Sequence, residues 1–220
     1  VTRGYKTLLL EQDDFAKGTS SRSTKLVHGG VRYLAQGNIS LVLEALRERG
    51  LLKQNAPHLV KDQSFIIPNY TWWGTPYYTL GLTMYDLMAG KLGYGRSLPF
   101  SKKRTLKHIP TLKSENLCGG VVYHDGQFDD SRLAINMCQT FVENGGVAIN
   151  YMKVEGFEKK NGKISAVKAT DLESGTKYTI EGKVVLNATG VFVDKVIKMD
   201  EPKAKDIVKV SQGVHLVLDK

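Results

Sequence analysis

Residues 18–34 read GTSSRSTKLVHGGVRYL, and this stretch decides the fold of the chain. It places five hydroxyl side chains ahead of Lys25 and two adjacent glycines after His28. Short hydroxyl side chains compete with the backbone for hydrogen bonds, and successive amides in a glycine-containing loop can bind phosphate. The stretch therefore predicts a loop around a polar ligand, although a capped turn before a helix explains the hydroxyl cluster alone equally well.

The segment before this loop reads TLLLE at residues 7–11. A short continuous apolar run that ends in an acid predicts a buried parallel strand with a carboxylate at its carboxyl end. In dinucleotide-binding βαβ units, an acid about 20 residues after the glycine-rich turn accepts hydrogen bonds from the ribose. Glu11 is the candidate for this acid. A turn at that distance would precede Val1, so we expect the front of the domain to be missing.

At this point the sequence resembles a known family. Residues 8–34 resemble the second strand and flavin-contacting loop of the FAD-dependent glycerol-3-phosphate dehydrogenases, the family that also contains the α-glycerophosphate oxidases. Three further segments resemble it in the same order: YHDGQFDDSRL at 123–133, VVLNATGVFVD at 184–194 and SQGVHLVL at 211–218.

The resemblance implies an α/β fold that is incomplete at both ends. The expected architecture is a Rossmann-like FAD-binding domain of the glutathione-reductase/D-amino-acid-oxidase type, with an inserted β-rich substrate domain. Residues 1–60 and 128–220 are expected to form the FAD-binding domain, and residues 61–127 part of the substrate or cap domain. On its own the chain is expected to be inactive.

The resemblance also implies the site residues, and it implies no metal. The expected FAD contacts are Glu11, Thr19, Ser20, Ser21, Lys25, Leu26, His28, Gly29, Gly30, Val154, Ala188, Thr189 and Gly190. Arg32 and Tyr33 would bind the substrate, and the guanidinium of Arg32 suits an anionic group. His215 would contact the substrate and assist removal of its hydroxyl proton while a hydride passes to the flavin.

The implied activity is oxidation of sn-glycerol 3-phosphate to dihydroxyacetone phosphate, with electrons passed to a quinone. The implied location is cytoplasmic, peripherally associated with the inner face of the cytoplasmic membrane, and a homo-oligomer is compatible with it. Three alternatives stay open: an oxygen-using glycerol-3-phosphate oxidase, another flavin amine or hydroxy-acid oxidase, and a basic module that binds membrane or nucleic acid without catalysis.

Composition limits these choices without deciding among them. The chain has 31 Lys and Arg against 22 Asp and Glu, a net charge of +9, which favours anionic partners. The basic run at residues 102–107 has no nucleic-acid motif beside it, so a solvated charge run explains it better and we expect no nucleic acid partner. Two cysteines without a C-x-x-C spacing support neither a disulfide framework nor a zinc site.

The remaining patterns predict an alternation of helices and strands. Helices are expected at 38–55, 75–88 and 131–144, strands at 64–68, 119–130, 147–151, 183–190 and 210–220, and a β-meander at 157–182. Arg49 is expected on the polar face of the first helix. The helix at 75–88 is apolar almost all round, which indicates either ordinary packing or, with Trp72, Trp73, Tyr77 and Tyr78, a membrane-facing surface.

Two pairs of neighbouring polar residues are further candidates. Asp129 and Asp130 precede a predicted helix, where adjacent acids more often cap the helix than catalyse. His124 and Asp125 are neighbours and offer a hypothetical pair of a base and the acid that orients it.

Overall fold

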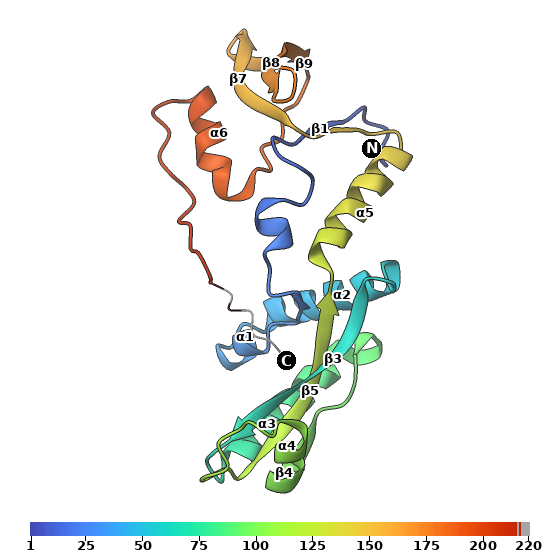
Figure 1. Cartoon of the computed structure of the whole chain (residues 1–220), viewed down its shortest axis with the longest axis vertical. Helices are drawn as coiled ribbons and strands as arrows, with labels where there is room; N and C mark the ends of the chain where they lie inside the picture. The colour runs from blue at the N-terminus through green and yellow to red at the C-terminus, as the bar shows by residue number, and fades with distance from the viewer. Residues whose placement is uncertain (215, 217–220) are drawn as a thin grey trace. The chain divides into compact units, whose positions relative to one another are not determined.

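The computed structural model describes residues 1–214 and 216 (Figure 1) and divides the chain into two compact units. One unit contains residues 1–19 and 134–220, and the other contains residues 20–133. These bounds differ from those of the two predicted domains, whose assignment to cofactor and substrate stays a prediction.

A parallel strand pair begins the first unit. Strand β1 (Leu8–Leu10) pairs in parallel with β6 (Val147–Ile149), so that Leu8 lies opposite Val147. The predicted parallel strand is confirmed, but its predicted burial is wrong, since Leu8 and Leu9 are 37% and 39% exposed. The reason is that β6 is the one ladder partner of β1 within residues 1–214 and 216.

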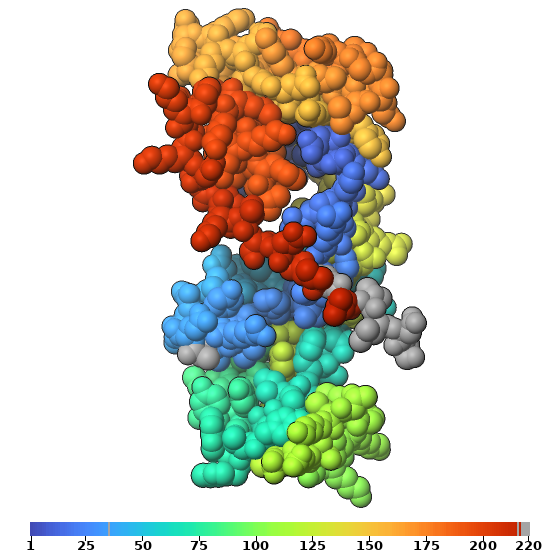
Figure 2. Space-filling model, turned by 60° about the vertical axis from the view of Figure 1, so that its left-hand side comes forward, coloured from blue at the N-terminus to red at the C-terminus, as the bar shows by residue number. Residues whose placement is uncertain are grey.

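The predicted β-meander is confirmed in the same unit. Strands β7 (Met152–Lys160), β8 (Lys163–Asp171) and β9 (Lys177–Glu181) pair antiparallel in chain order. Asn161 and Gly162 connect the first two strands with φ angles of 52° and 75°, as a tight hairpin turn requires. Helix α6 (Val193–Asp200), red in Figure 2, packs against β7, where Lys159 Nζ lies 2.9 Å from Asp200 Oδ1.

One other predicted strand is wrong, and the described part of a second is irregular. Residues 183–189 form no strand, and Val184 and Leu186 are 77% and 84% exposed. Residues 210–214 and 216, the described part of the last predicted strand, are also irregular. Apolar β-branched residues predict a strand only if a partner strand is present, and the described part of the chain offers these segments no ladder partner.

An antiparallel sheet organises the second unit. Its central strand β5 (Gly119–Phe128) pairs along its whole length with β3 (Val60–Asn69). Strand β2 (Leu26–Val27) pairs with the carboxyl end of β5, and β4 (Leu98–Ser101) pairs with its amino-terminal half. The strand predicted at 64–68 is confirmed and is longer than expected.

The helices of this unit pack on the sheet and on one another. They are α1 (Val31–Ala35), α2 (Ile39–Asn55), α3 (Gly74–Ala89) and α4 (Lys102–His108), with short 3₁₀ turns at Gly18–Ser21 and Gly90–Leu92. A Cβ on Gly119 would face Thr75 of α3, whereas one on Gly120 would face Thr105 of α4. Since neighbouring residues of a strand point to opposite faces, α3 and α4 cover opposite faces of β5.

Helix α5 (Asp130–Glu143) follows β5 and contains the boundary between the two units. The main buried cluster lies between α2 and α3 and consists of Val42, Leu46, Tyr85 and Ala89. The helices predicted at 38–55, 75–88 and 131–144 are all confirmed. Arg49 is the exception to the pattern expected for α2, because it is buried with 2% exposure rather than solvated.

The outer face of α3 is exposed and aromatic. Tyr77 and Leu80 are 56% and 67% exposed, and Trp72, just before the helix, is 82% exposed, while Leu82 and Tyr85 of α3 are buried. Within the described residues, none of the helices has the length and hydropathy that crossing a bilayer requires.

Candidate functional site

Asp130 anchors the first half of the 18–34 loop. Its Oδ2 accepts hydrogen bonds from Ser23 N at 3.1 Å and from Ser23 Oγ at 2.7 Å, and its Oδ1 forms an ion pair with Lys25 Nζ. Lys25 Nζ also donates to the carbonyl of Ser21 at 2.7 Å. One carboxylate at the start of α5 therefore organises the turn that precedes β2.

The protonation state of Asp130 follows from these contacts. Burial raises the pKa of this carboxyl, but the hydrogen bonds from Lys25 and Ser23 and from the amide of Ser131 outweigh it and lower the pKa to about 2. Asp130 is therefore ionised at neutral pH although it is only 4% exposed.

The loop then joins the sheet. Lys25 has a positive φ of 60°, and its carbonyl accepts from Phe128 N at 3.0 Å. Leu26 and Val27 lie opposite Gln127 and Gly126 as strand β2. The loop between Ser23 and Val27 is thus attached to the end of β5 and the start of α5.

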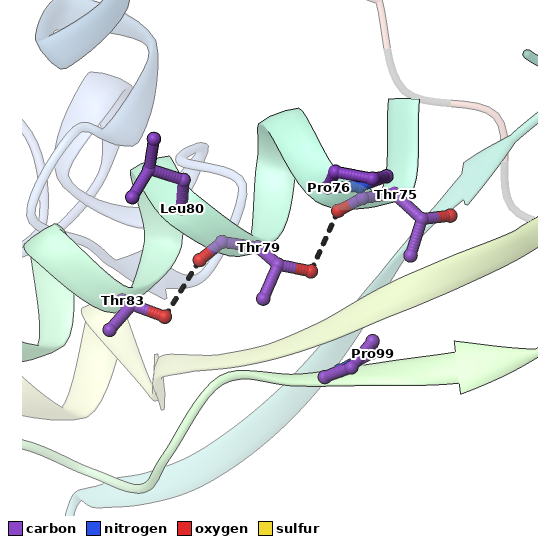
Figure 3. A pocket seen from close by; sticks show the side chains of 6 residues that line it. All are labelled: Thr75, Pro76, Thr79, Leu80, Thr83 and Pro99. Atoms are coloured by element: carbon purple, nitrogen blue, oxygen red, sulfur yellow. Dashed lines mark hydrogen bonds between the residues drawn. The ribbon is translucent and has the colours of Figure 1, made fainter. Parts of the chain in front are cut away.

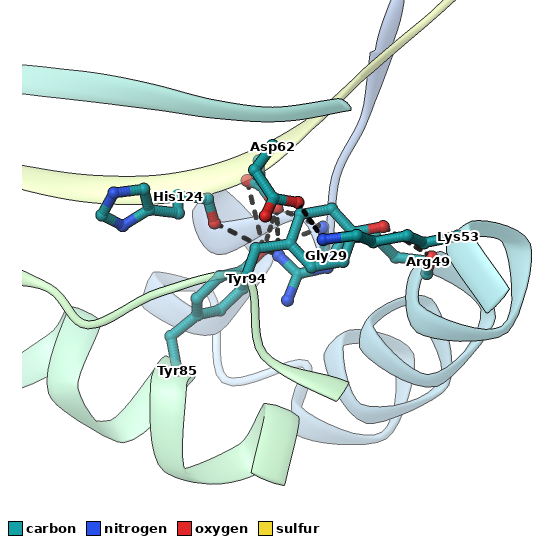
Figure 4. Close-up of polar contacts among 8 residues, drawn as sticks. Gly29, Arg49, Lys53, Asp62, Tyr85, Tyr94 and His124 are labelled. Atoms are coloured by element: carbon teal, nitrogen blue, oxygen red, sulfur yellow. Dashed lines mark hydrogen bonds and ion pairs between the residues drawn. The ribbon is translucent and has the colours of Figure 1, made fainter. Parts of the chain in front are cut away.

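A buried network holds the second half of the loop at Gly29 (Figure 4). Gly29 N donates to Tyr85 Oη at 2.8 Å, and Tyr85 Oη lies 2.9 Å from Asp125 Oδ1. Arg49 forms an ion pair with Asp125, with side-chain exposures of 2% and 5%. We call Arg49, Tyr85 and Asp125 the Asp125 network.

Aromatic rings and a second cation complete the surroundings of Arg49. Its guanidinium carbon lies 4.4 Å from the centroid of the Tyr94 ring, and Tyr94 Oη donates to its carbonyl at 2.8 Å. Lys53 pairs with Asp62 and lies 4.5 Å from the same ring (Figure 4). Burial, and then the charge of Asp125, raises the pKa of Tyr85, so this hydroxyl stays protonated and can donate to Asp125.

Packing explains why residues 29 and 30 are glycines. A Cβ on Gly29 would lie 2.4 Å from both Leu46 Cδ2 and Tyr85 Oη. Gly30 has a φ of +72° and is the N-cap of helix α1, and a Cβ there would lie 2.8 Å from Tyr33 Cδ2. The position that a Cβ would take at Gly29 therefore faces the protein core. The predicted approach of Gly29 to a ligand must use the other side of the backbone.

The remaining candidates of the second unit lie on its surface. Ser20, His28, Arg32 and Tyr33 are exposed, as is Thr19, which ends the first segment of the other unit. Ser21, Lys25 and Leu26 are half-buried. Arg32 acts on Tyr123 through its charge: burial raises the pKa of Tyr123, Asp125 raises it further, and Arg32 partly offsets both. The exposed candidates combine hydroxyls, an imidazole and a guanidinium, which suit a polar, anionic ligand.

Glu11 lies at the carboxyl end of β1 in the first unit, as predicted. Its backbone bridges two strands, since its N–H donates to Ile149 at 2.9 Å and its carbonyl accepts from Met152 N at 2.8 Å. Its Oε1 accepts from Asp13 N at 3.0 Å, which leaves Oε2 to accept from a ligand. Val154, another candidate, is half-buried in β7.

Asn187 organises the turn that holds the last candidates. Its Oδ1 accepts from Thr189 Oγ1 at 2.8 Å and from Thr189 N at 3.3 Å, and its Nδ2 donates to Val193 O at 3.0 Å. Gly190 has a φ of +56°, and no atom lies within 4 Å of the position of a Cβ. Ala188, Thr189 and Gly190 are exposed, so the backbone of this turn is accessible.

Each unit, taken by itself, offers groups that suit a part of FAD. Glu11 offers a carboxylate oxygen suited to a ribose, and Gly190 offers the open backbone that a diphosphate requires. The loop from Ser20 to Tyr33 offers hydroxyl and amide donors. His215, the predicted catalytic residue, lies outside the described residues.

Sequence reasoning missed the residues that position the loop. Tyr85 and Arg49 were not candidates, and Asp130 was considered only as a helix cap or a catalytic acid. Their roles in positioning the loop depend on contacts between residues far apart in the sequence. The hypothetical pair of His124 and Asp125 is wrong, since Asp125 accepts from Arg49 and Tyr85 instead. The capping role expected for Asp129 is confirmed by its hydrogen bond from Arg132 N at 3.0 Å.

An open groove of about 440 Å³ lies between α3 and β4 (Figure 3). The residues that line it are Thr75, Pro76, Thr79, Leu80, Thr83 and Pro99. Thr79 and Thr83 donate their hydroxyls to the helix carbonyls four residues earlier, each at 2.7 Å. The groove therefore presents mainly apolar groups and has no ionisable side chain for redox or acid–base chemistry.

Comparison with known proteins adds an independent finding. The family model described as FAD dependent oxidoreductase matches residues 1–220. The chain is 43% identical over 231 aligned residues to the mitochondrial glycerol-3-phosphate dehydrogenase of Homo sapiens, covering 99% of this chain and 32% of that protein. For the enzyme of Schizosaccharomyces pombe the identity is 42% over 234 residues, covering 99% and 36%. The chain thus spans about a third of the length of these curated relatives.

Solved structures agree with this result. A glycerol-3-phosphate dehydrogenase from Bacillus halodurans, in complex with FAD, matches with a TM-score of 0.68 and 36% identity, over 90% of this chain and 32% of that one. An L-proline dehydrogenase from P. horikoshii matches with a TM-score of 0.65 at 18% identity, over 93% and 51%. The second match supports the fold alone.

Proposed function

Because the chain belongs to the family of FAD-dependent oxidoreductases, we propose that it forms part of an enzyme that oxidises sn-glycerol 3-phosphate to dihydroxyacetone phosphate. The observation that carries the proposal is the 43% identity to glycerol-3-phosphate dehydrogenase over 99% of the chain. This coverage includes the loop at residues 18–34, whose exposed polar groups suit a phosphorylated substrate and a dinucleotide.

The residues take distinct roles in this proposal. Glu11 accepts hydrogen bonds from the adenosine ribose, and the Thr189-Gly190 turn lies near the diphosphate. Arg32, on the surface at the start of α1, binds the anionic substrate, with Tyr33 beside it. His215 takes up the hydroxyl proton of the substrate. The flavin supplies hydride-accepting chemistry when bound, and the chain's own residues bind, orient and exclude water.

The proposal also includes electron transfer to a quinone and association with a membrane surface. The exposed aromatic residues of α3 and the net charge of +9 support a peripheral contact with an anionic bilayer. The curated relatives at 42–43% identity are named mitochondrial, which favours a mitochondrial membrane over the cytoplasmic membrane that the sequence suggested. Binding of the purified protein to anionic vesicles tests this part separately.

The visible absorption spectrum of the full-length protein tests the activity directly. We expect a bound flavin band that bleaches when glycerol 3-phosphate is added without oxygen. A band that persists with this substrate but bleaches with an amino acid or hydroxy acid would place the protein with other members of the family. Peroxide formed in step with turnover in air would identify the oxygen-using alternative. A folded protein without a flavin band would refute the proposal.

A further inference from the structure

The Asp125 network binds the amide of Gly29 from the core side of the loop. This places three side chains of α2, α3 and β5 behind the backbone of residues 28–30, which the family resemblance implies as the close approach to the isoalloxazine of FAD. We propose that Arg49, Tyr85 and Asp125 are positioning residues, which orient the peptide between His28 and Gly29 so that the His28 carbonyl oxygen can accept from an N–H group of the isoalloxazine. The inference rests on the proposed function.

The first step is the direction of the peptide. Gly29 N donates to Tyr85 Oη at 2.8 Å, and the same amide lies 3.4 Å from Asp125 Oδ1. A trans peptide is planar, with its N–H and C=O pointing to opposite sides. Because the amide of Gly29 points into the buried network, the carbonyl of His28 points away from it.

The second step is that this carbonyl is available. His28 is exposed, and in residues 1–214 and 216 no hydrogen bond to its carbonyl oxygen is found. An oxidised isoalloxazine ring carries an N–H donor along its edge, and a backbone acceptor is a suitable partner for it. The orientation of the peptide therefore decides whether this acceptor faces the ring.

The third step is that the network is buried and internally hydrogen-bonded. Tyr85 is 1% exposed and Arg49 is 2% exposed, and Asp125 accepts from both. Arg49 also donates to the carbonyl of His124 at 3.3 Å and stacks on Tyr94. The missing side chain of Gly29 allows Tyr85 Oη to approach the amide, since a Cβ would lie 2.4 Å from that oxygen.

The test uses the full-length protein with FAD and compares Tyr85→Phe with Tyr94→Phe. Both changes remove one hydroxyl from the same region, but only Tyr85 contacts Gly29. For Tyr85→Phe we expect FAD to stay bound, the visible circular dichroism of the flavin to change, and the limiting rate of flavin reduction by glycerol 3-phosphate to fall by about tenfold. The substrate concentration at half the limiting rate should change little. Tyr94→Phe should match the wild type.

Several outcomes would overturn the inference. These are a wild-type flavin spectrum and reduction rate in Tyr85→Phe, and equal changes in both variants, which would indicate general loosening of the core. If Tyr85→Phe does not fold, Arg49→Lys keeps the charge and should change the flavin spectrum in the same sense but less.

Hydrogen exchange of the protein without FAD separates this inference from the proposed function. We expect the amide of Gly29 to exchange faster in Tyr85→Phe than in Tyr94→Phe, and equal exchange would overturn the role of the network. A wild-type protein that binds no flavin would refute the proposed function instead.

Discussion

Lys25 and Asp130 form an ion pair across 105 residues of sequence, and Ser23 donates to the same carboxylate. The pair joins the polar loop to the first residue of α5. Side-chain exposure is 42% for Lys25 and 3% for Asp130, so water screens the cation while the anion depends on its protein donors. The loop conformation is therefore coupled to the ionisation of one buried acid.

Replacement of Asp130 by Asn should lower stability by about 1–2 kcal/mol at neutral pH, because the charge that Lys25 and Ser23 stabilise is lost. The pKa of Asp130 is lowered to about 2 in the folded protein, so the wild type should lose this contribution as the pH falls from about 4 towards 2. Urea unfolding at pH 7 and pH 3 measures both effects. A difference between wild type and variant that stays constant over this range would contradict the assignment.

Gly29→Ala should destabilise the protein by about 1–3 kcal/mol, since the added methyl group would lie 2.4 Å from Leu46 Cδ2 and Tyr85 Oη. Gly81→Ala in α3 is the matched control, because no atom lies within 4 Å of its Cβ position. That change should be neutral or stabilise the helix by about 0.5–1 kcal/mol. Thermal unfolding measures both variants, and equal stability of the two would show that the core around residue 29 can relax.

Arg49→Met should lower the free energy of unfolding by about 3–5 kcal/mol, since it removes the cation that pairs with the buried carboxylate of Asp125. Lys113→Met is the control, because the ion pair of Lys113 with Glu115 is 3.5 Å long and its side chains are 78% and 71% exposed. Loss of this exposed ion pair should lower the free energy of unfolding by less than about 1 kcal/mol. Chemical unfolding of both variants gives the comparison, and a small effect for Arg49→Met would mean that water or another group compensates Asp125.

The regular elements could be predicted from the sequence because their signals are local. The apolar spacing of α2, the glycines after α5 and the Asn161-Gly162 turn each act within a few residues. The parallel pairing of β1 was also predictable, but its exposure was not, since burial depends on neighbouring strands. The segment at 183–189 was mispredicted for the same reason: its apolar residues indicate a strand only if a partner lies beside it.

The Asp125 network could not be predicted from the sequence. Asp125 is separated from Tyr85 by 40 residues and from Arg49 by 76, and no local pattern distinguishes either contact. Arg49 resembles any solvated residue of a charged helix face. One signal was present: Asp125 follows the apolar Val121, Val122 and Tyr123 in its strand, and a carboxylate buried in such a strand requires a hydrogen-bonded cation.

Arg32→Ala should weaken binding of glycerol 3-phosphate about tenfold to a hundredfold in the full-length protein while FAD stays bound, because a charge-assisted contact to the substrate is lost. Arg22→Ala is the control, since Arg22 is also exposed and lies on the same loop but is not a predicted substrate contact. Anaerobic titration of the flavin spectrum with substrate measures both. An unchanged response of Arg32→Ala would remove this residue from the proposed site.

His215→Ala should lower the rate of flavin reduction more than it lowers substrate affinity, because the proposed role of His215 is proton removal rather than binding. The expectation rests on the resemblance of SQGVHLVL at 211–218 to the family. Stopped-flow reduction over a range of substrate concentrations separates the limiting rate from the affinity. His58→Ala is a suitable control, since His58 follows the end of α2 and has no predicted role in the site. If His215→Ala reduces its flavin at the wild-type rate, His215 serves packing, and the proton must pass to another group.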